Sequence, residues 1–249
     1  MSARFRIATY NIHKCKGLDL RVKPRRIVEV LRQIKADVIA LQEVVSIENG
    51  SAEKDQARFI AEELGYEMTM GENRRHRGGG YGNVLLSRFP IVESRNLDIT
   101  IKGREPRGCL HAGVTLDNSM VVDIYNLHLG TAFVERRHQA RRLLDTEILN
   151  RRHSAPRIML GDFNEWTNGL ASRLLKHHFP SSDIRSHIGR KHTYPGFLPF
   201  LHLDHIYYDH HLVLENASVH RSRKALVASD HLPLVADFRL ESPEHTIGF

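Results

Sequence analysis

The feature that most constrains the fold of this chain is a series of short strand-like segments, interrupted by only three clearly helical ones. Several of these segments alternate apolar and polar residues and are joined by short turns, a pattern typical of antiparallel or mixed sheets. We therefore predict an α/β protein with two packed β-sheets and helices outside them. The strand-like segments are FRIATYNI, DVIALQEV, NVLLSR, IVESRNLDIT, CLHAGVTL, MVVDIYNLHL, RIMLGDFN, LDHIYY, LENASVH and LVADFRL.

The segments with helical periodicity span residues 23–35, 51–65 and 134–152. The first spaces its apolar residues three and four positions apart and has Pro24 near its start, which is typical of an amphipathic helix. The second offers Ser51 as an N-cap and Gly65 as a C-terminal stop. The third is strongly basic on its polar face.

The chain of 249 residues is long enough for one large domain, and it contains no linker and no short-period repeat. We predict a single domain over residues 1–241 and a loose tail over residues 242–249. Cys15 and Cys109 are the only cysteines, which argues against a disulfide framework or a zinc ribbon. No apolar stretch approaches the ~20 residues of a membrane helix and no apolar leader precedes the first strand, so we expect a soluble, cytoplasmic protein.

Polar side chains recur where the strand-like segments end. In an extended chain, residues i and i+2 face the same way, so Asp162 and Asn164 of GDFN can hold one object together. Carboxylates and amides suit Mg²⁺, Mn²⁺ or Ca²⁺ better than zinc, and histidines suit proton transfer near neutral pH. With a formal net charge of +7, this set is typical of phosphate-ester hydrolysis. Its members are Asn11, His13, Glu43, Asn126, His128, Asp162, Asn164, Asp204, Asp230 and His231.

Each of these residues, taken alone, has a simpler explanation. Asp162 is then better interpreted as a cap of the turn after its strand, and Glu43 as an ordinary loop acid. His128 is equally compatible with a buried core histidine, and Asp230 with an N-cap. The combination favours a functional site because all of these residues occur in order at strand ends of one chain.

Seven motifs resemble, in sequence and in order, those of the endonuclease/exonuclease/phosphatase superfamily, which has the DNase I-like fold: TYNIH, LQEV, GNVLLSR, NLHLG, GDFN, LDHIY and SDHLP. The resemblance extends from Asn11 to His231. EPRG and HTYPGF…LDHIY are most similar to a bacterial branch of metal-dependent hydrolases, some of them associated with cardiolipin synthase. The resemblance implies a four-layer α/β/β/α sandwich, with two mixed, mostly antiparallel sheets packed face to face, helices outside and the active site at one end of the sheets.

The resemblance also implies a divalent metal site. Asn11 and Glu43 match the family's metal-binding amide and glutamate, and Asp230 matches the acid that completes this neighbourhood. The expected cofactor is Mg²⁺ or Mn²⁺, as one or two ions. His13 and His128 stand where abasic-site endonucleases of the superfamily carry an aspartate and a tyrosine, so the chain is more similar to the DNase-like and phosphodiesterase-like members.

Five residues match the family's catalytic positions. His231 corresponds to the general base, and Asp204 to the acid that orients it. His128 corresponds to the second histidine, which contacts the phosphate or protonates the leaving group. Asp162 and Asn164 match the pair that positions the attacking water and the phosphate, or a second metal.

Four further residues are candidates for binding the phosphate or the rest of the substrate. The family places a phosphate-contacting arginine in the region of GREPRG, and we favour Arg107 over Arg104. Thr193 is a candidate hydroxyl donor to the phosphate, and Asn83 is expected to support Glu43 or the substrate. A solvated surface arginine or a turn-capping threonine explains the individual residues almost as well.

Two segments rich in glycine or proline are predicted to form loops. NRRHRGGGYGN, residues 73–83, lacks the spacing of a P-loop and is expected to be a flexible basic loop beside the site. YPGFLPFLHL, residues 194–203, could contact a membrane, but we favour a loop packed into the core. The histidines form neither a zincin motif nor a metallo-β-lactamase ladder, which makes zinc the minor option.

We predict a divalent-metal-dependent phosphodiester hydrolase, and we favour an endonuclease that cuts DNA with a metal-assisted, histidine-activated water. The basic net charge and the resemblance favour nucleic acid as the substrate. The first alternative is a phospholipid phosphodiesterase or phosphatase of the sphingomyelinase or phosphoinositide-phosphatase type, acting on anionic phospholipid. The second alternative is a non-catalytic binding module on the same fold. No obligate protein partner is expected.

Overall fold

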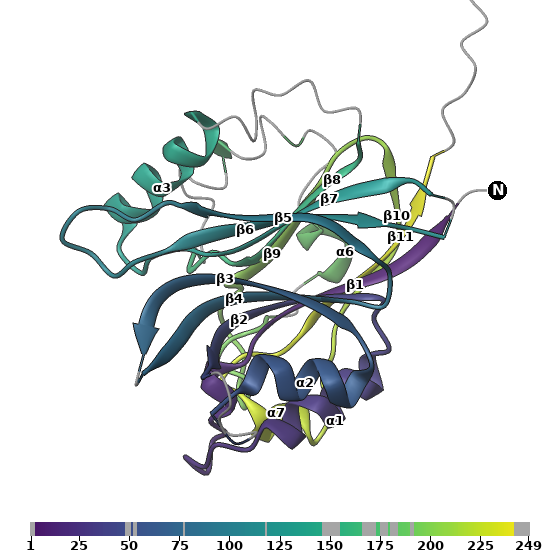
Figure 1. Cartoon of the computed structure of the whole chain (residues 1–249). Helices are drawn as coiled ribbons and strands as arrows, with labels where there is room; N and C mark the ends of the chain where they lie inside the picture. Colours follow the sequence, from purple (N-terminus) through teal and green to yellow (C-terminus); the bar gives the residue numbers. More distant parts are fainter. Residues whose placement is uncertain are drawn as a thin grey trace, which may run out of the picture.

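Two β-sheets lie face to face in the computed structural model of the chain, with helices on the outer face of each (Figure 1). The structure describes residues 3–47, 51, 54–76, 78–117, 119–145, 155–165, 173–174, 179, 184–189 and 192–241. The predicted tail over residues 242–249 lies outside these ranges. No helix among the described residues is long and apolar enough to cross a membrane.

The first sheet has six strands, and only its β1–β2 pair is parallel. Three of its strands, residues 4–11, 38–46 and 79–87, have few exposed positions, because one face packs against the second sheet and the other against helices. In spatial order the strands are β10 (Leu212–Val219), β11 (Leu234–Leu240), β1 (Arg4–Asn11), β2 (Val38–Ser46), β4 (Gly79–Ser87) and β3 (Glu67–His76).

The second sheet has five strands, and only its β7–β8 pair is parallel. In spatial order they are β5 (Ile91–Asp98), β6 (Gly108–Thr115), β7 (Val121–His128), β8 (Arg157–Asp162) and β9 (Asp204–Tyr208). Both sheets are therefore mixed and mostly antiparallel, as predicted.

The helices complete the predicted four-layer sandwich. Helices α1 (Pro24–Ile34), α2 (Gln56–Leu64) and α7 (Ala225–Ala228) cover the first sheet, where one apolar cluster joins them to β1, β2 and β4. Helix α3 (Phe133–Asp145) covers the second sheet through Ala140 and Leu143. A third cluster fills the space between the sheets. The remaining short helices are η1 (His13–Cys15) and α6 (Arg185–Ile188).

Helix α1 follows its sequence pattern closely, whereas the start of α2 does not. The apolar stripe of α1 is buried, with Ile27 and Leu31 against the first sheet. The prediction of a Ser51 cap was wrong, because α2 begins at Gln56 and the Asp55 carboxylate accepts the hydrogen bond from the Arg58 amide. Gly65 ends the helix in the left-handed conformation, as predicted.

The expected flexible loop over residues 73–83 is instead part of a β-hairpin formed by β3 and β4. Strand β3 was not predicted, because its sequence is polar and leads into a run of glycines. These glycines allow the strands to approach each other rather than to bend freely: a Cβ on Gly82 would lie 1.9 Å from the carbonyl oxygen of Gly71.

Candidate active site

The topology brings four predicted residues to one end of the two sheets. Asn11, His128 and Asp162 are the last residues of β1, β7 and β8, and Asp204 is the first residue of β9. Asp162 pairs in register with His128 on one side and with Asp204 on the other. Because β7 and β8 are parallel and β9 is antiparallel to them, these side chains emerge at the same edge.

Asp162 is the centre of this cluster and is 1 % exposed. Its Oδ2 accepts a hydrogen bond from Asn11 Nδ2 at 3.0 Å, and it lies 3.5 Å from His128 Nε2 and 3.6 Å from His231 Nε2. Its Oδ1 accepts the backbone N–H of Asn164 at 2.9 Å. One buried carboxylate therefore faces both histidines and the side-chain amide of Asn11 from the first sheet.

His231 is held by Asp204 in the orientation of a general base. The Nδ1–H donates to Asp204 Oδ2 at 2.9 Å, and Asp204 is fully buried. This bond leaves Nε2 directed toward Asp162. Burial lowers the pKa of His231, but the negative charges of Asp204 and Asp162 outweigh burial and raise this pKa to about 10.

His128 is held in a different protonation state by Arg107. The Arg107 guanidinium donates to His128 Nδ1 at 2.9 Å, and because an arginine always donates, Nδ1 is the acceptor and the ring proton lies on Nε2. Burial and the charge of Arg107 lower the pKa of His128 to about 4. The ring is therefore a neutral hydrogen-bond donor that points toward Asp162.

These opposite shifts predict how stability depends on pH in the absence of divalent ions. The unfolded chain takes up a proton on His128 below about pH 6.5, whereas the folded protein does so only near pH 4, so this contribution to stability is present above pH 6.5 and is lost as the pH falls. The His231 contribution has the opposite sign: it is present below about pH 6.5 and is lost as the pH rises toward 10. The free energy of unfolding should therefore be greatest near pH 6.5.

Urea unfolding from pH 4 to pH 10 in metal-free buffer tests this expectation. Each limb should amount to roughly 3 kcal/mol or more. His128→Gln should reduce the fall of the free energy of unfolding at acid pH and leave its fall at alkaline pH. His231→Gln should have the opposite effect. If both variants kept both limbs, other groups would be responsible for the pH dependence.

Glu43 lies beside Asn11 at an irregular point of β2. The register between β2 and β4 shifts between Leu41 and Val44, and Glu43 has a left-handed φ of 58°, a conformation that is costly for a non-glycine residue and is found at functional sites. Its carboxylate accepts from Asn11 Nδ2 at 3.3 Å and pairs with Lys14 Nζ at 2.5 Å. Burial would raise its pKa, but the positive charge that His128 gains at low pH and the Lys14 ammonium outweigh burial and lower it to about 2.

The donor atoms of the site fit a divalent cation. Glu43 is ionised and already attracts one positive group, the Lys14 ammonium. Asp230 lies near Asn11, since the hydroxyl of the adjacent Ser229 donates to the carbonyl oxygen of Asn11 and Asp230 Oδ1 is 3.4 Å from His13 Nδ1. Oxygen donors of this kind suit Mg²⁺ or Mn²⁺. A second candidate set is formed by Asp162, Asp204 and His231, whose ligand atoms lie within 4.8 Å of one another.

The other predicted residues lie at different distances from this centre. The Asn164 side chain donates to the Leu129 carbonyl oxygen at 2.8 Å, so its amide nitrogen holds the segment after β7. The Thr193 hydroxyl accepts from the Leu203 and Asp204 amides at 3.4 and 3.5 Å and supports the start of β9. Arg104 is exposed on the segment before β6.

Asn83 belongs to a buried network that joins the sheets beneath the site rather than to the surroundings of Glu43. Its Nδ2 donates to the carbonyl oxygens of Gly108 at 3.0 Å and Asn126 at 3.3 Å. Gln42 Nε2 donates to Asn126 Oδ1 at 2.8 Å, and Asn126 Nδ2 donates back to Leu41 of the first sheet. Buried amides that are paired across two sheets hold their relative position.

The sequence reasoning missed three residues of the site. Lys14 pairs with Glu43, Gln42 bonds to Asn126, and the Tyr194 ring lies 4.9 Å from the His231 ring between centroids. Gln42 directly precedes Glu43 and could have been found as a polar residue in a buried strand. Lys14 and Tyr194 carried no such signal, because their roles depend on contacts across the fold.

The loop over residues 194–203 is not packed into the core, so that prediction was wrong. Phe197, Leu198 and Phe200 are 59 %, 64 % and 61 % exposed. The backbone of this loop is fixed by the Gly196 amide, which donates to the carbonyl oxygen of Asp230. The loop therefore presents apolar side chains at the edge of the catalytic cluster.

Other exposed apolar side chains lie on segments at the same end of the two sheets. All exposed large apolar residues of the described chain except Met68 and Val92 lie on segments that follow β1 or β7 or that precede β9 or β11. We call these residues the apolar rim: Leu18, Leu20, Val22, Phe133, Val134, Phe197, Leu198, Phe200 and Val227.

A two-sheet sandwich with a histidine–carboxylate pair, a second histidine and oxygen donors that could hold a cation is typical of a class of phosphoester hydrolases. The chain belongs to the Endonuclease/Exonuclease/phosphatase family, whose sequence profile matches residues 8–231. Members of this family are generally dependent on divalent metals, and the acidic and histidine clusters of this site are suited to hold them. The protein is thus a hydrolase of this family.

Several known proteins are similar over almost the whole chain. Uncharacterized protein YbhP of Escherichia coli K12 is 29 % identical over 254 residues, covering 95 % of this chain and 96 % of the relative. A family protein from Bacteroides thetaiotaomicron has a TM-score of 0.81 at 17 % identity, covering 97 % of this chain and 99 % of the other. The mannosyl-6-phosphatase Bt3783 of the same organism has a TM-score of 0.75 at 18 % identity, covering 94 % and 99 %. These structural similarities define the fold.

Proposed function

We propose that the protein is a divalent-metal-dependent phosphodiesterase in which His231 activates the attacking water. The observation that carries this proposal is the buried Asp204–His231 pair, whose Nε2 faces Asp162. Asp204 orients the ring through Nδ1, so that Nε2 can accept the proton of a water. His128 carries its proton on Nε2 and can donate a hydrogen bond to a phosphoryl oxygen or to the leaving oxygen.

Asn11, Glu43 and Asp230 would hold the cation, with Asp162 beside them. When bound, the ion would polarise the phosphoryl oxygens and cancel part of the negative charge that raises the pKa of His231. Arg107 remains next to His128 and adds a fixed positive charge where the phosphate would lie.

DNA is the substrate that we propose first. The net charge of +7 favours a polyanion, and Arg107 adds positive charge beside the catalytic cluster. Supercoiled plasmid incubated with Mg²⁺, Mn²⁺ or a chelator tests this proposal. We expect nicking that requires the metal and is lost in His231→Ala. An intact plasmid with either ion would exclude DNA as the substrate.

The apolar rim favours a second candidate substrate, a phospholipid in an anionic bilayer. Exposed aromatic and aliphatic side chains around a phosphoesterase site would insert between lipids, while the basic surface is attracted to their head groups. Burying one large apolar side chain contributes about 1.5–3 kcal/mol, so the rim residues Phe197, Leu198 and Phe200 together could contribute most of the membrane affinity.

Replacing these three rim residues with serine separates the two substrates. If vesicles containing phosphatidylglycerol are the substrate, their hydrolysis should fall at least about tenfold, while hydrolysis of soluble bis(p-nitrophenyl) phosphate is unchanged. Met68→Ser with Val92→Ser is the matched control, because these apolar side chains are exposed at the other end of the sheets. Equal loss on both substrates would indicate a folding defect instead.

A further inference from the structure

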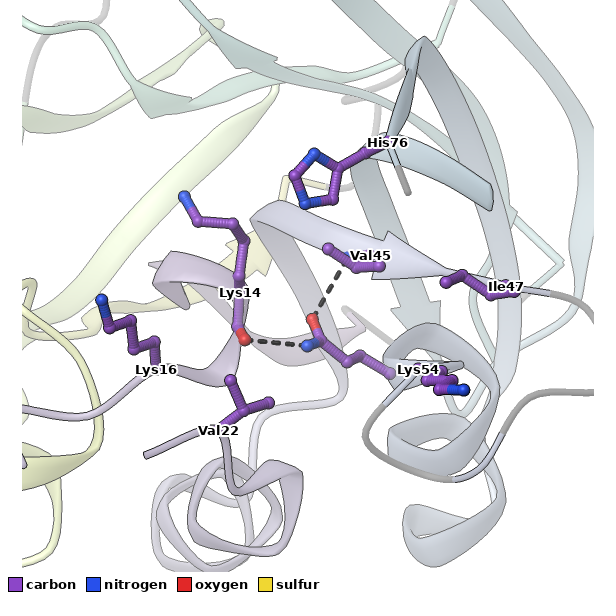
Figure 2. A pocket seen from close by; sticks show the side chains of 8 residues that line it. Lys14, Lys16, Val22, Val45, Ile47, Lys54 and His76 are labelled. Atoms are coloured by element: carbon purple, nitrogen blue, oxygen red, sulfur yellow. Dashed lines mark hydrogen bonds between the residues drawn. The ribbon is translucent and has the colours of Figure 1, made fainter. Parts of the chain in front are cut away.

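A basic cavity is lined in part by Lys14, the residue that pairs with Glu43 (Figure 2). Its volume is about 400 Å³, enough for a phosphate group and part of the molecule that carries it. It lies where the segment after β1 meets the end of β2 and the start of α2. The lining residues are Lys14, Lys16, Val22, Val45, Ile47, Lys54, Gln56 and His76.

Gln56, which is 2 % exposed, fixes the walls of this cavity. Its side-chain nitrogen donates to the carbonyl oxygen of Lys14 at 2.8 Å, and its side-chain oxygen accepts the backbone N–H of Val45 at 3.1 Å (Figure 2). The segment that carries Lys14 and Lys16 is thereby tied to strand β2. The cavity is a built feature of the fold, because one buried side chain connects its three sides.

The cavity adjoins the catalytic centre through two connections. Lys14 lines it and also pairs with Glu43 at 2.5 Å. Val45 follows Glu43 by two residues on β2. A molecule whose phosphate lies at Glu43 can therefore place a neighbouring group in the cavity.

The charge of the cavity is positive. Among the described residues, Lys14 is neutralised by Glu43, whereas Lys16 and Lys54 form no ion pair, and no carboxylate lines the walls. Lysine ammonium groups bind phosphate as compact point charges. His76 adds an imidazole ring, which can donate an N–H to an anion.

We infer that this cavity binds a second phosphate group of the substrate, adjacent to the phosphate that is hydrolysed. The inference rests on the proposed phosphodiesterase function and deepens it, because it states that good substrates carry two phosphates. The second group can come from the neighbouring linkage of a polynucleotide or from the head group of a phospholipid. Both sources present the same anionic oxygens to Lys16 and Lys54.

Binding is tested without any reaction. Inorganic pyrophosphate titrated calorimetrically into the metal-free protein should bind, and Lys16→Ala with Lys54→Ala should weaken binding at least about tenfold. Arg4→Ala with Arg239→Ala is the matched control, because it removes two positive charges from an exposed ion-pair cluster with Glu215 far from the cavity. Absent binding to the wild type, or unchanged affinity in the lysine variant, would overturn the inference.

Kinetics then identify the source of the second phosphate. Thymidylyl-thymidine is compared with its 5′-phosphorylated form, and phosphatidylinositol vesicles with phosphatidylinositol 4-phosphate vesicles. In the pair that is hydrolysed, the doubly phosphorylated compound should have a KM lower by about tenfold, and the lysine variant should lose this preference without slowing bis(p-nitrophenyl) phosphate. Equal KM values within that pair would refute the inference. A failure to hydrolyse any of the compounds would refute the proposed function; the calorimetric affinity for pyrophosphate would then decide whether the cavity binds phosphate.

Discussion

Replacing His231 with alanine is expected to lower kcat for phosphodiester hydrolysis by about 10²–10⁴-fold, the range that a positioned general base contributes. Asp204 occupies Nδ1 of the ring at 2.9 Å, so Nε2 is the one nitrogen directed toward Asp162 and the proposed water. Steady-state kinetics with bis(p-nitrophenyl) phosphate and Mn²⁺ measure the loss. The KM should change little, because the base acts on the water and not on the bound diester.

A matched histidine makes this result specific. His220 lies outside the site, with its Nε2 3.2 Å from Gln33 Oε1, and His220→Ala should retain the wild-type kcat. Asp204→Asn should reduce kcat as well, because an amide no longer holds the imidazole in the required tautomer. A His231→Ala enzyme within tenfold of the wild-type kcat would show that another group activates the water.

Replacing Glu43 with glutamine is expected to weaken Mn²⁺ binding by at least about tenfold and to remove metal-dependent activity. Changes to residues that only support metal ligands cost about 10–100-fold in affinity, so the loss of a ligand charge should cost no less. Glu43 is ionised well below neutral pH and lies against Asn11, so it is an anionic donor of the proposed metal set. Calorimetric titration of Mn²⁺ measures the change.

Two comparisons separate metal binding from turnover. Glu62→Gln removes an equal charge from the exposed face of α2, where Glu62 pairs with Arg58, and should bind Mn²⁺ like the wild type. His231→Ala should also bind Mn²⁺ normally while lacking turnover. If Glu43→Gln bound the ion with unchanged affinity, the alternative set of Asp162, Asp204 and His231 would be the metal site.

The two catalytic histidines illustrate how much of the site follows from the sequence. Both could be selected because they follow apolar strand segments in motifs that resemble a known family. Their protonation states could not be predicted, because Arg107 contacts His128 and Asp204 contacts His231 from 21 and 27 residues away. These contacts give the rings pKa values of about 4 and about 10, although both residues have the same intrinsic value.

The hairpin and the apolar loop show where local patterns mislead. The segment 73–83 looks like a loop because glycine is rare in strands. Position 82 nevertheless needs glycine, because a Cβ there would clash with the backbone of Gly71 on the neighbouring strand. The segment 194–203 looks like a core segment because it is apolar, yet Phe197 and its neighbours are exposed. Whether an apolar residue is buried depends on what packs over it, which its own sequence does not contain.

Strand alternation, helical stripes and the polar residues at strand ends were sufficient to predict the two sheets, helix α1 and the residue types of the catalytic cluster. These features are local, because the periodicity of buried positions can be recognised within one continuous segment of the chain. The pairing of Lys14 with Glu43, the buried amide network and the basic cavity arise only when distant segments are packed together. Their distances depend on strand register and sheet packing, and a shift of one residue would turn strand residues such as Gln42 and Asn126 to the opposite face.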